Sequence, residues 1–319
     1  MPATLLARFQ LAIPSWPLPL AAAISGGSDS IALMHLLAQS HLHPLILHFN
    51  HNLRPASGDE AAWVAAEAAK LGLSCHIGHC DALPSGNLYE AARLARYEFL
   101  TTTCHQRHIP TLLIAHQAND SAETLLHHLL RGSGLSGLSS LVPDRLENGL
   151  RLIRPLLGFD RETLRHWLRD QNLAWLDDPS NANIHHLRPR LRHQVLPCLE
   201  QAQTTGTPVL ALNRSAQLLK EANAALEWSL DQLLPQLDIR SEENLLSLDH
   251  TSLAQWPTEL QDRLLLRLHR QLTHCGHPPN GRARTAFQEM LLNPKSQWML
   301  TIHRLTIRRV KTRVYFLPK

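Results

Sequence analysis

The feature that most constrains this chain is a glycine-containing turn near its amino terminus. The motif SGGSDS at residues 25–30 follows a short apolar run and precedes an apolar pattern with helical spacing that begins at Ile31. A strand that turns through glycines into a helix leaves backbone N–H groups pointing outward, and the helix dipole adds about half a positive charge there. Gly26 and Gly27 let the backbone approach an anion closely. The turn therefore predicts a site for a phosphate or pyrophosphate.

The side chains of the turn extend this prediction. Ser25, Ser28 and Ser30 offer hydroxyl groups, and Asp29 can hold a metal ion. A P-loop of the GxxxxGK[ST] kind requires a lysine, which this turn lacks. The hexapeptide resembles instead the SGGxDS loop of the ATP pyrophosphatases, which cleave ATP to AMP and pyrophosphate while adenylating a substrate. An ordinary Gly/Ser turn that caps a helix is the alternative.

The first two hundred residues alternate between short apolar runs and helical patterns. Strands are predicted at 20–25, 44–49, 73–78 and 111–115, and helices at 29–39, 58–71, 88–104 and 119–131. This alternation is typical of an α/β fold with a Rossmann-like parallel sheet and helices on both faces. Such sheets bind ligands at the carboxyl ends of their strands.

Polar side chains follow the predicted strands at that edge. His48 and Asn50 follow the second run, and His116 follows the fourth. Asp120 and Glu123 then share one face of the helix 119–131. Two carboxylates there could bind Mg²⁺ or pair with the amines of a cationic substrate. A capping box at the start of the helix is the alternative explanation for both acids. We expect these residues to form one site with the turn.

The length of the chain and the distribution of charge along it predict more than one domain. A chain of 319 residues exceeds the usual size of one core. We expect a catalytic domain at 1–205, a linking helix at 206–235 and a smaller α+β domain at 236–319. Residues 263–319 hold 12 Lys and Arg against the single acid Glu289, whereas residues 1–205 hold 16 against 17. The basic segment predicts a surface that binds nucleic acid, and a basic solvated tail is the alternative.

Two sets of arginines are candidate contacts to RNA or phosphate. An alternating apolar pattern over 300–316 predicts a β-hairpin that carries Arg308 and Arg309. Within the first domain the candidates are Arg54 after the second predicted strand, Arg93 and Arg96 on the helix 88–104, Arg131 beside a glycine-containing loop, and the spaced arginines Arg188, Arg190 and Arg192. For Arg93, a solvated ion pair with Glu90 explains the spacing equally well.

Composition points to the cytoplasm. The five cysteines are widely and irregularly spaced, which suits reduced thiols rather than a disulfide framework. Prolines 14, 17 and 19 break any signal-peptide helix, and no run approaches the roughly 20 apolar residues that a membrane span needs. We therefore expect no membrane partner. The histidines are scattered, so we assign them no metal site.

Seven motifs in order make the chain similar to one family, the tRNA(Ile)-lysidine synthetases. They cover most of residues 20–200 and read SGGSDS at 25–30, HFNHNLR at 48–54, EAARLARY at 90–97, AHQANDSAET at 115–124, LRGSGLSGL at 130–138, IRPLL at 153–157 and DPSN at 178–181. The carboxyl-terminal part resembles the family's substrate-binding domain only in length and character. The resemblance implies a PP-loop ATPase domain followed by that smaller domain.

The resemblance also implies a reaction. ATP would adenylate O2 of the wobble cytidine, position 34, in an isoleucine tRNA with a CAU anticodon, and the ε-amine of free L-lysine would then displace AMP to give lysidine. Residues 25–30, with His48, Asn50 and His116, would hold ATP. Asp29 and Asp120 would lie near Mg²⁺, and Asp120 and Glu123 near the lysine. The expected partners are this tRNA, lysine and, as an open alternative to a monomer, a second copy of the chain.

The chain departs from the family's pattern at two places. Asn119 stands where many members have Asp, and Pro189 follows Arg188 where Asn is usual. The longer members carry a further carboxyl-terminal module, so we expect residues 206–319 to hold the tRNA.

Three other functions remain open from the sequence. A tRNA 2-thiolation enzyme of the same fold would need a cysteine pair or cluster ligands, for which Cys75 and Cys80 are the nearest match. An ammonia-using ligase would not need the basic segment. A non-catalytic RNA-binding protein would not need Asp29, Asp120 and Glu123.

Overall fold

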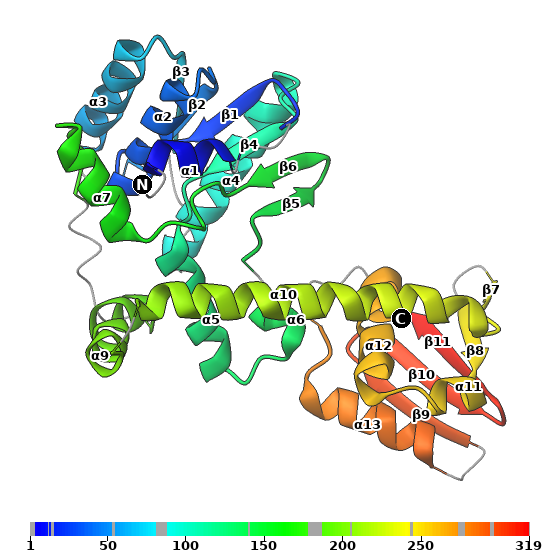
Figure 1. Cartoon of the computed structure of the whole chain (residues 1–319). Helices are drawn as coiled ribbons and strands as arrows, with labels where there is room; N and C mark the ends of the chain where they lie inside the picture. The colour runs from blue at the N-terminus through cyan, green and yellow to red at the C-terminus, as the bar shows by residue number, and fades with distance from the viewer. Residues whose placement is uncertain are drawn as a thin grey trace. The chain divides into compact units, whose positions relative to one another are not determined.

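The computed structural model describes residues 4–11, 13, 16–52, 55–80, 88–139, 141–177, 187–204, 206–242, 245–273, 278–293 and 297–318, with the backbone alone at 88, 89 and 242. They belong to two compact units, Met1–Lys220 and Glu221–Lys319 (Figure 1). The division falls inside the predicted linking helix 206–235, which corresponds to α10 (Pro208–Leu233). The predicted site residue Arg54 and the motif at 178–181 lie outside the described residues.

The first unit alternates strands and helices as the apolar runs predict. Its strands are β1 (Leu20–Ala23), β2 (Leu45–Asn50), β3 (Cys75–His79), β4 (Thr111–Ile114), β5 (Asp144–Glu147) and β6 (Leu150–Ile153). Its helices are α1 (Leu5–Leu11), α2 (Ser28–Gln39), α3 (Ser57–Lys70), α4 (Leu88–Gln106), α5 (Ala118–Leu130), α6 (Leu135–Leu138), α7 (Arg161–Asp170), α8 (Leu187–Arg190) and α9 (Leu196–Ala202). The four predicted strands and four predicted helices are confirmed to within two residues at each end.

The six strands form one mostly parallel sheet in the order β3-β2-β1-β4-β6-β5. Ala22 of β1 lies opposite Ile46 of β2 and Leu113 of β4, so β1 is central and its short side chains are covered on both sides. Only β5 runs antiparallel, at the edge beside β6. All parallel strands therefore end at one edge, where the polar clusters of the sequence meet.

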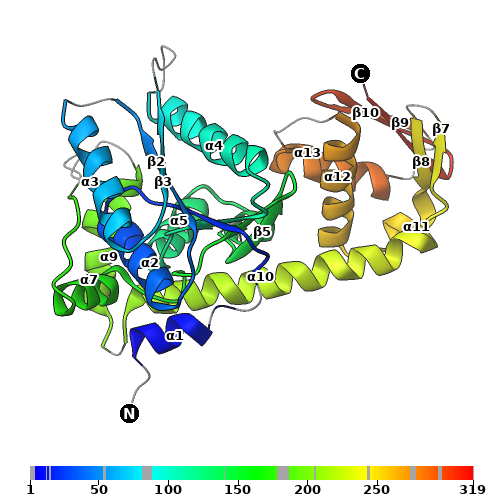
Figure 2. The ribbon, with the colours of Figure 1, turned by 90° about the horizontal axis from the view of Figure 1, so that it is seen from above.

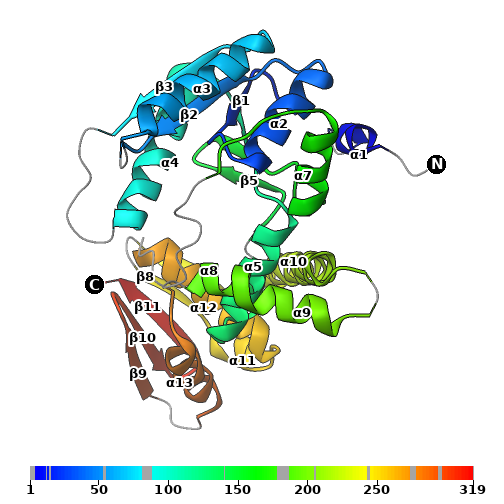
Figure 3. The same cartoon turned by 90° about the vertical axis from the view of Figure 1, so that its left-hand side faces the viewer.

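Helices cover both faces of this sheet (Figures 2 and 3). On one face, Leu36 of α2, Val64 of α3 and Leu164 of α7 belong to a common buried core. On the other face, Leu100 and Cys104 of α4 pack against the sheet. The predicted α/β architecture is confirmed.

The second unit is an antiparallel sheet covered by helices. Its strands, in the sheet order β7-β8-β11-β10-β9, are β7 (Arg240–Glu242), β8 (Leu245–Asp249), β11 (Arg313–Pro318), β10 (Leu305–Val310) and β9 (Gln297–Ile302). The segment 300–316, predicted as one hairpin, contains parts of three strands that form two successive hairpins, β9–β10 and β10–β11, and β8 and β7 extend the sheet. Helices α11 (His250–Ala254), α12 (Thr258–Thr273) and α13 (Gly281–Leu292) contribute to a core that contains Leu264, Phe287 and Phe316. Within the described residues, no helix combines the length and apolar character needed to cross a bilayer.

Candidate active site

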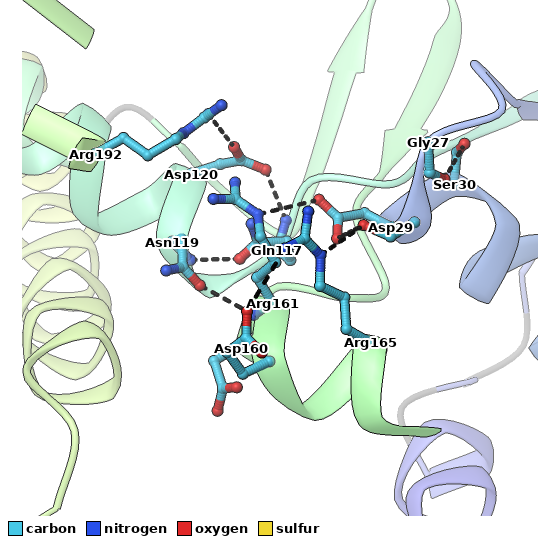
Figure 4. A network of polar contacts seen from close by, with 12 residues as sticks. Gly27, Asp29, Ser30, Gln117, Asn119, Asp120, Asp160, Arg161, Arg165 and Arg192 are labelled. Atoms are coloured by element: carbon cyan, nitrogen blue, oxygen red, sulfur yellow. Dashed lines mark hydrogen bonds and ion pairs between the residues drawn. The ribbon is translucent and has the colours of Figure 1, made fainter. Parts of the chain in front are cut away.

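The glycine turn joins β1 to α2 and is held in shape by Ser30 (Figure 4). The Ser30 hydroxyl accepts the backbone N–H groups of Ser25 at 3.2 Å and of Gly26 at 3.1 Å, and it donates to the carbonyl of Gly27 at 2.9 Å. Gly26 has a φ of +94°, in the left-handed region that favours glycine. Gly27 caps α2 without a side-chain hydrogen bond. The first N–H groups of α2 are thus left for an anion.

Asp29 lies in the first turn of α2, beside this anion site. The Ser28 hydroxyl donates to its Oδ1 at 3.3 Å, and Arg161 Nε lies 3.9 Å from its Oδ2. Burial raises the pKa of Asp29, Arg161 opposes this rise, and the negative charge of Asp120 adds to it. Two carboxylates are therefore close enough to repel each other, an arrangement that a bound cation would relieve.

Asp120 caps the start of α5 and faces Arg192 (Figure 4). Its Oδ2 accepts the backbone N–H of Gln117 at 3.0 Å, and the Gln117 side chain completes a capping box. Its Oδ1 lies 3.9 Å from Arg192 Nη2. The capping role predicted as an alternative for Asp120 and Glu123 thus applies to Asp120 with Gln117, and Glu123 takes no part in it.

Glu123 is buried and paired with arginine. It is only 2% exposed, and Arg192 donates to its two oxygens from Nε at 2.7 Å and from Nη2 at 3.0 Å. Arg161 Nη2 lies 3.9 Å from the same carboxylate. Arg192 belongs to a π-helical turn, Leu191–Val195, a rare conformation that is often found at functional sites. Glu123 therefore positions two arginines, and its oxygens are already engaged.

The predicted ATP contacts on the other strands are brought to the same edge. His48 is buried, its Nδ1 lies 2.9 Å from the carbonyl oxygen of Ile24, and burial lowers its pKa. The buried Asn50 accepts the backbone N–H of Asn52 at 2.8 Å. His116 Nδ1 accepts a hydrogen bond from Arg154 Nε at 3.0 Å. His48 and Asn50 thus support the local backbone as well as facing the site.

These side chains line one cleft of about 960 Å³ in the first unit. A volume of this order suits a nucleotide together with part of a second substrate. Its lining includes Ser25, Gly27, Ser28, Asp29, Ser30, His48, Asn50, Arg96, His116, Asp120, Arg161, Arg165 and Arg192. The residues predicted from three separate motifs therefore share one cavity.

The predicted arginine contacts of the first unit are not equivalent. Arg96 and Arg192 line the cleft. Arg93 forms the surface ion pair with Glu90, with Nη2 and Oε1 2.9 Å apart, so the alternative structural explanation accounts for it. The remaining candidates, Arg131, Arg188 and Arg190, are exposed outside the lining of the cleft, where they are accessible to a polyanion.

In the second unit the structure separates the two predicted arginines. Arg308 is exposed on β10. Arg309 is 8% exposed, and its guanidinium donates to the carbonyl oxygens of Met290 and Asn293 at the end of α13. This geometry corrects the predicted phosphate contact of Arg309, because its donors hold α13 to the sheet.

The basic segment is also partly neutralised within the second unit. Arg263 and Arg267 pair with Glu227, Arg284 pairs with Asp262, and Arg313 pairs with Asp238. Those acids precede residue 263, so a count that begins there overstates the local charge. The exposed cations of the described segment are Arg270, Arg282, Arg304, Arg308 and Lys311.

Sequence reasoning missed the basic residues of α7. Arg161 and Arg165 lie one helical turn apart at the start of α7, and both line the cleft. The Asn119 side chain accepts the backbone N–H of Arg161 at 3.0 Å, which ties α7 to α5. The sequence did contain a signal for the helix itself. Leu164 and Leu168 form its buried stripe, and Asp160 caps its start.

The donor set suits Mg²⁺ bound together with phosphate. Within the described part of the chain no group of three His, Cys, Asp or Glu side chains forms a ready metal cage. Mg²⁺ commonly uses only one or two carboxylates plus substrate phosphates. Asp29 and Asp120, whose mutual repulsion raises the pKa of Asp29, provide such a pair.

The chain is similar to known proteins over most of its length. Residues 10–199 match a family described as a PP-loop domain. The chain is 36% identical over 269 residues to the tRNA(Ile)-lysidine synthase of Ruegeria pomeroyi, covering 82% of this chain and 63% of that protein. It is 35% identical to the enzyme of that name from Bradyrhizobium sp., covering 77% of this chain and 72% of the relative. For Zymomonas mobilis the identity is 33%, with 79% and 75% covered.

The chain spans less than two thirds of some relatives, 63% of the Ruegeria protein and 62% of the Anaplasma marginale protein. Among solved structures, a U34-tRNA thiolase from Methanococcus maripaludis matches with a TM-score of 0.58 at 15% identity, covering 68% of this chain and 77% of that one. At this identity the likeness concerns the fold.

Proposed function

Because the chain belongs to the tRNA(Ile)-lysidine synthase family, we propose that it is the ligase that attaches lysine to C2 of cytidine 34 in the CAU-anticodon isoleucine tRNA. ATP is the co-substrate and leaves as AMP and pyrophosphate. One observation carries the proposal: a glycine turn with open helix N–H groups shares a single cleft with Asp29 and Asp120. These substrates also give the proposed location, the cytoplasm.

The residues of the cleft take distinct parts in this proposal. The first turn of α2 binds the phosphates of ATP, while Arg96 and Arg161 add positive charge to the same cleft. Asp29 and Asp120 would hold Mg²⁺, which neutralises charge that develops on the phosphates. Asp120 lines the cleft, whereas both oxygens of Glu123 accept hydrogen bonds from Arg192, so Asp120 is also the carboxylate that would attract the lysine ammonium. Glu123 acts indirectly, by holding Arg192 and Arg161.

The thiolation alternative finds less support in the cysteines. Burial raises the pKa of Cys75, and it raises the pKa of Cys104 to about 11. Burial thus favours the thiol form of Cys75, one member of the predicted Cys75–Cys80 pair, over the thiolate that sulfur transfer requires.

The test combines the full chain, ATP, labelled lysine and a transcript of the CAU isoleucine tRNA. We expect one lysine per tRNA, equal release of AMP and pyrophosphate, and no incorporation into a methionine tRNA with the same anticodon. Replacement Asp29→Asn should lower incorporation at least about 100-fold while tRNA binding persists. Asp59→Asn, at the start of α3, is the matched control. Equal activity of the Asp29 and Asp59 variants would remove Asp29 from the reaction.

A further inference from the structure

His116, a predicted ATP contact that lines the cleft, is paired with Arg154, whose role the proposed reaction leaves unexplained. His116 follows β4, and Arg154 follows β6, the neighbouring strand. Arg154 Nε donates to His116 Nδ1 at 3.0 Å. The same guanidinium donates from Nη1 to the carbonyl of Val142 at 2.8 Å, and the Arg154 backbone N–H bonds the carbonyl of Pro143 at 2.7 Å. Arg154 is thus fixed at its backbone and at its tip.

The direction of this hydrogen bond determines where the imidazole carries its proton. A guanidinium has only donors and stays protonated in proteins. His116 Nδ1 must therefore present its lone pair to Arg154. In a neutral imidazole whose Nδ1 is an acceptor, the proton resides on Nε2. His116 lines the cleft, and within the described residues no partner for Nε2 is recorded.

We infer that Arg154 fixes His116 in the neutral tautomer with the proton on Nε2, so that His116 donates a hydrogen bond to a substrate oxygen and does not accept the proton of the attacking amine. The tautomer follows from the contact with Arg154 alone, whereas the role toward a substrate oxygen depends on the proposed function.

The charges around His116 act in the same direction. Arg154, Arg96 of α4 and Arg188 of α8 are all cationic, and Tyr97 of α4 lines the same cleft. Burial, followed by these three arginines, lowers the pKa of His116 to about 3. Protonation would add a fourth positive charge to this group. The imidazole therefore stays neutral throughout the physiological range of pH.

The pair also indicates the class of ligand atom. Arg154 is 7% exposed, and burial lowers its pKa; Tyr97 and Glu147 oppose this effect, but within the described residues no carboxylate forms a direct ion pair with Arg154. A buried cation whose charge is only partly compensated is costly, so its presence favours a negatively charged ligand nearby. We therefore assign the His116 Nε2–H to an anionic oxygen, that of a phosphate or of the adenylated pyrimidine.

Histidine-selective ¹⁵N labelling tests the tautomer. The His116 signals are assigned by their disappearance in His116→Gln. At pH 7 we expect an unprotonated Nδ1 and a protonated Nε2, with no titration between pH 5 and 8. In Arg154→Met, His116 should populate both tautomers, and its pKa should rise while burial, Arg96 and Arg188 still hold it below the ordinary value. Arg151→Met, which removes a partly exposed arginine of β6 that pairs with Asp144, should leave the His116 signals unchanged. A proton on Nδ1, or titration of wild-type His116 in this range, would overturn the inference.

Lysine incorporation tests the donor role separately. The amide nitrogen of Gln reaches the position of Nε2, whereas that of Asn does not. We expect His116→Gln to stay within about tenfold of wild type and His116→Asn to lose about 100-fold. Equal losses would refute the donor role and leave the tautomer result standing. Wild-type protein that shows the expected NMR signals without lysine incorporation would refute the proposed function instead.

Discussion

The charged form of Asp29 is energetically costly in the folded protein without ligand. Burial and Asp120 raise its pKa above the ordinary value of 3.8, and Arg161 offsets this only in part. A carboxyl group whose pKa is raised by folding destabilises the folded state above that pKa, and this cost disappears as the pH falls and the group takes up its proton. Sites that bind phosphate and metal often carry such a cost until the ligand binds.

The first prediction follows from this destabilising effect of the Asp29 charge. Asp29→Asn removes the charge, so the melting temperature without ligand should rise by about 2 °C at pH 8. The gain should shrink as the pH falls toward 4. Scanning calorimetry over this pH series measures it, and Asp59→Asn should show no gain at any pH. A lower melting temperature of Asp29→Asn at pH 8 would contradict the assigned cause.

The second prediction concerns the two acids of α5, which differ in burial. Glu123 is 2% exposed and compensates Arg192. Glu123→Ala removes the carboxylate that accepts two hydrogen bonds from Arg192, and we expect a loss of about 3 kcal/mol in the free energy of unfolding. Asp120→Ala removes only a cap and should cost about 1 kcal/mol. Urea unfolding of both variants compares them, and equal losses would show that Glu123 is not the structural anchor.

At the scale of elements, the turn between β1 and α2 depends on one of its two glycines far more than on the other. Gly26 has a φ of +94°, and an added Cβ would lie 2.8 Å from Leu176 Cδ1. Gly27 has a φ of −70°, and its nearest neighbour would be Ser25 Oγ at 3.7 Å.

The third prediction uses this pair. Gly26→Ala should lower the free energy of unfolding by about 2 kcal/mol, because it combines backbone strain with a steric clash. Gly27→Ala should change it by less than about 0.5 kcal/mol. Thermal unfolding without nucleotide gives the comparison, and a larger effect at Gly27 would refute the geometry of the turn.

The elements of the sheet were predictable because buried parallel strands read as apolar runs. β1 to β4 and the helices that follow them stand out in this way. β5 did not, since its residues DRLE are mostly exposed at the sheet edge, with Leu146 73% exposed. The contacts of Arg161 and Arg165 with α2 could not be predicted, because they join residues far apart in the sequence.

The burial of Arg309 could have been predicted from the alternation of buried and exposed residues along its strand. Leu305, Ile307 and Arg309 alternate on β10 and are all buried, so the period of the strand alone places Arg309 on the covered face. Arg308 has the opposite parity and is exposed. The prediction relied on the net positive charge of the segment, and a net charge does not distinguish a buried arginine from an exposed one.

At the scale of the whole molecule, several arginines of the second unit already pair with acids or carbonyl groups of the same unit. Arg263, Arg267 and Arg313 are committed to acids of the same unit, and Arg309 to backbone carbonyls. The surface available to a polyanion is therefore smaller than the basic count of the sequence predicts.

The fourth prediction separates the two neighbouring arginines of β10. Arg308→Glu should weaken tRNA binding by about tenfold at low salt and reduce the salt dependence of binding, with an unchanged melting temperature. Arg309→Met should instead destabilise the protein by about 2 kcal/mol, because carbonyl groups at the end of α13 lose their donor. Filter binding over a salt series and thermal unfolding measure both. Unchanged tRNA binding by Arg308→Glu would place the RNA surface elsewhere.

The Leu176 backbone N–H donates to the Gly26 carbonyl at 2.9 Å, and the Leu176 side chain packs into the core beneath the turn. This contact has a consequence for protein synthesis. The ribosome delivers the nucleotide-binding motif early, yet the residue that closes it emerges only after the whole sheet has been translated. A nascent chain arrested before that point carries the motif without its closing hydrogen bond, so we expect the turn to reach its final form only late in translation.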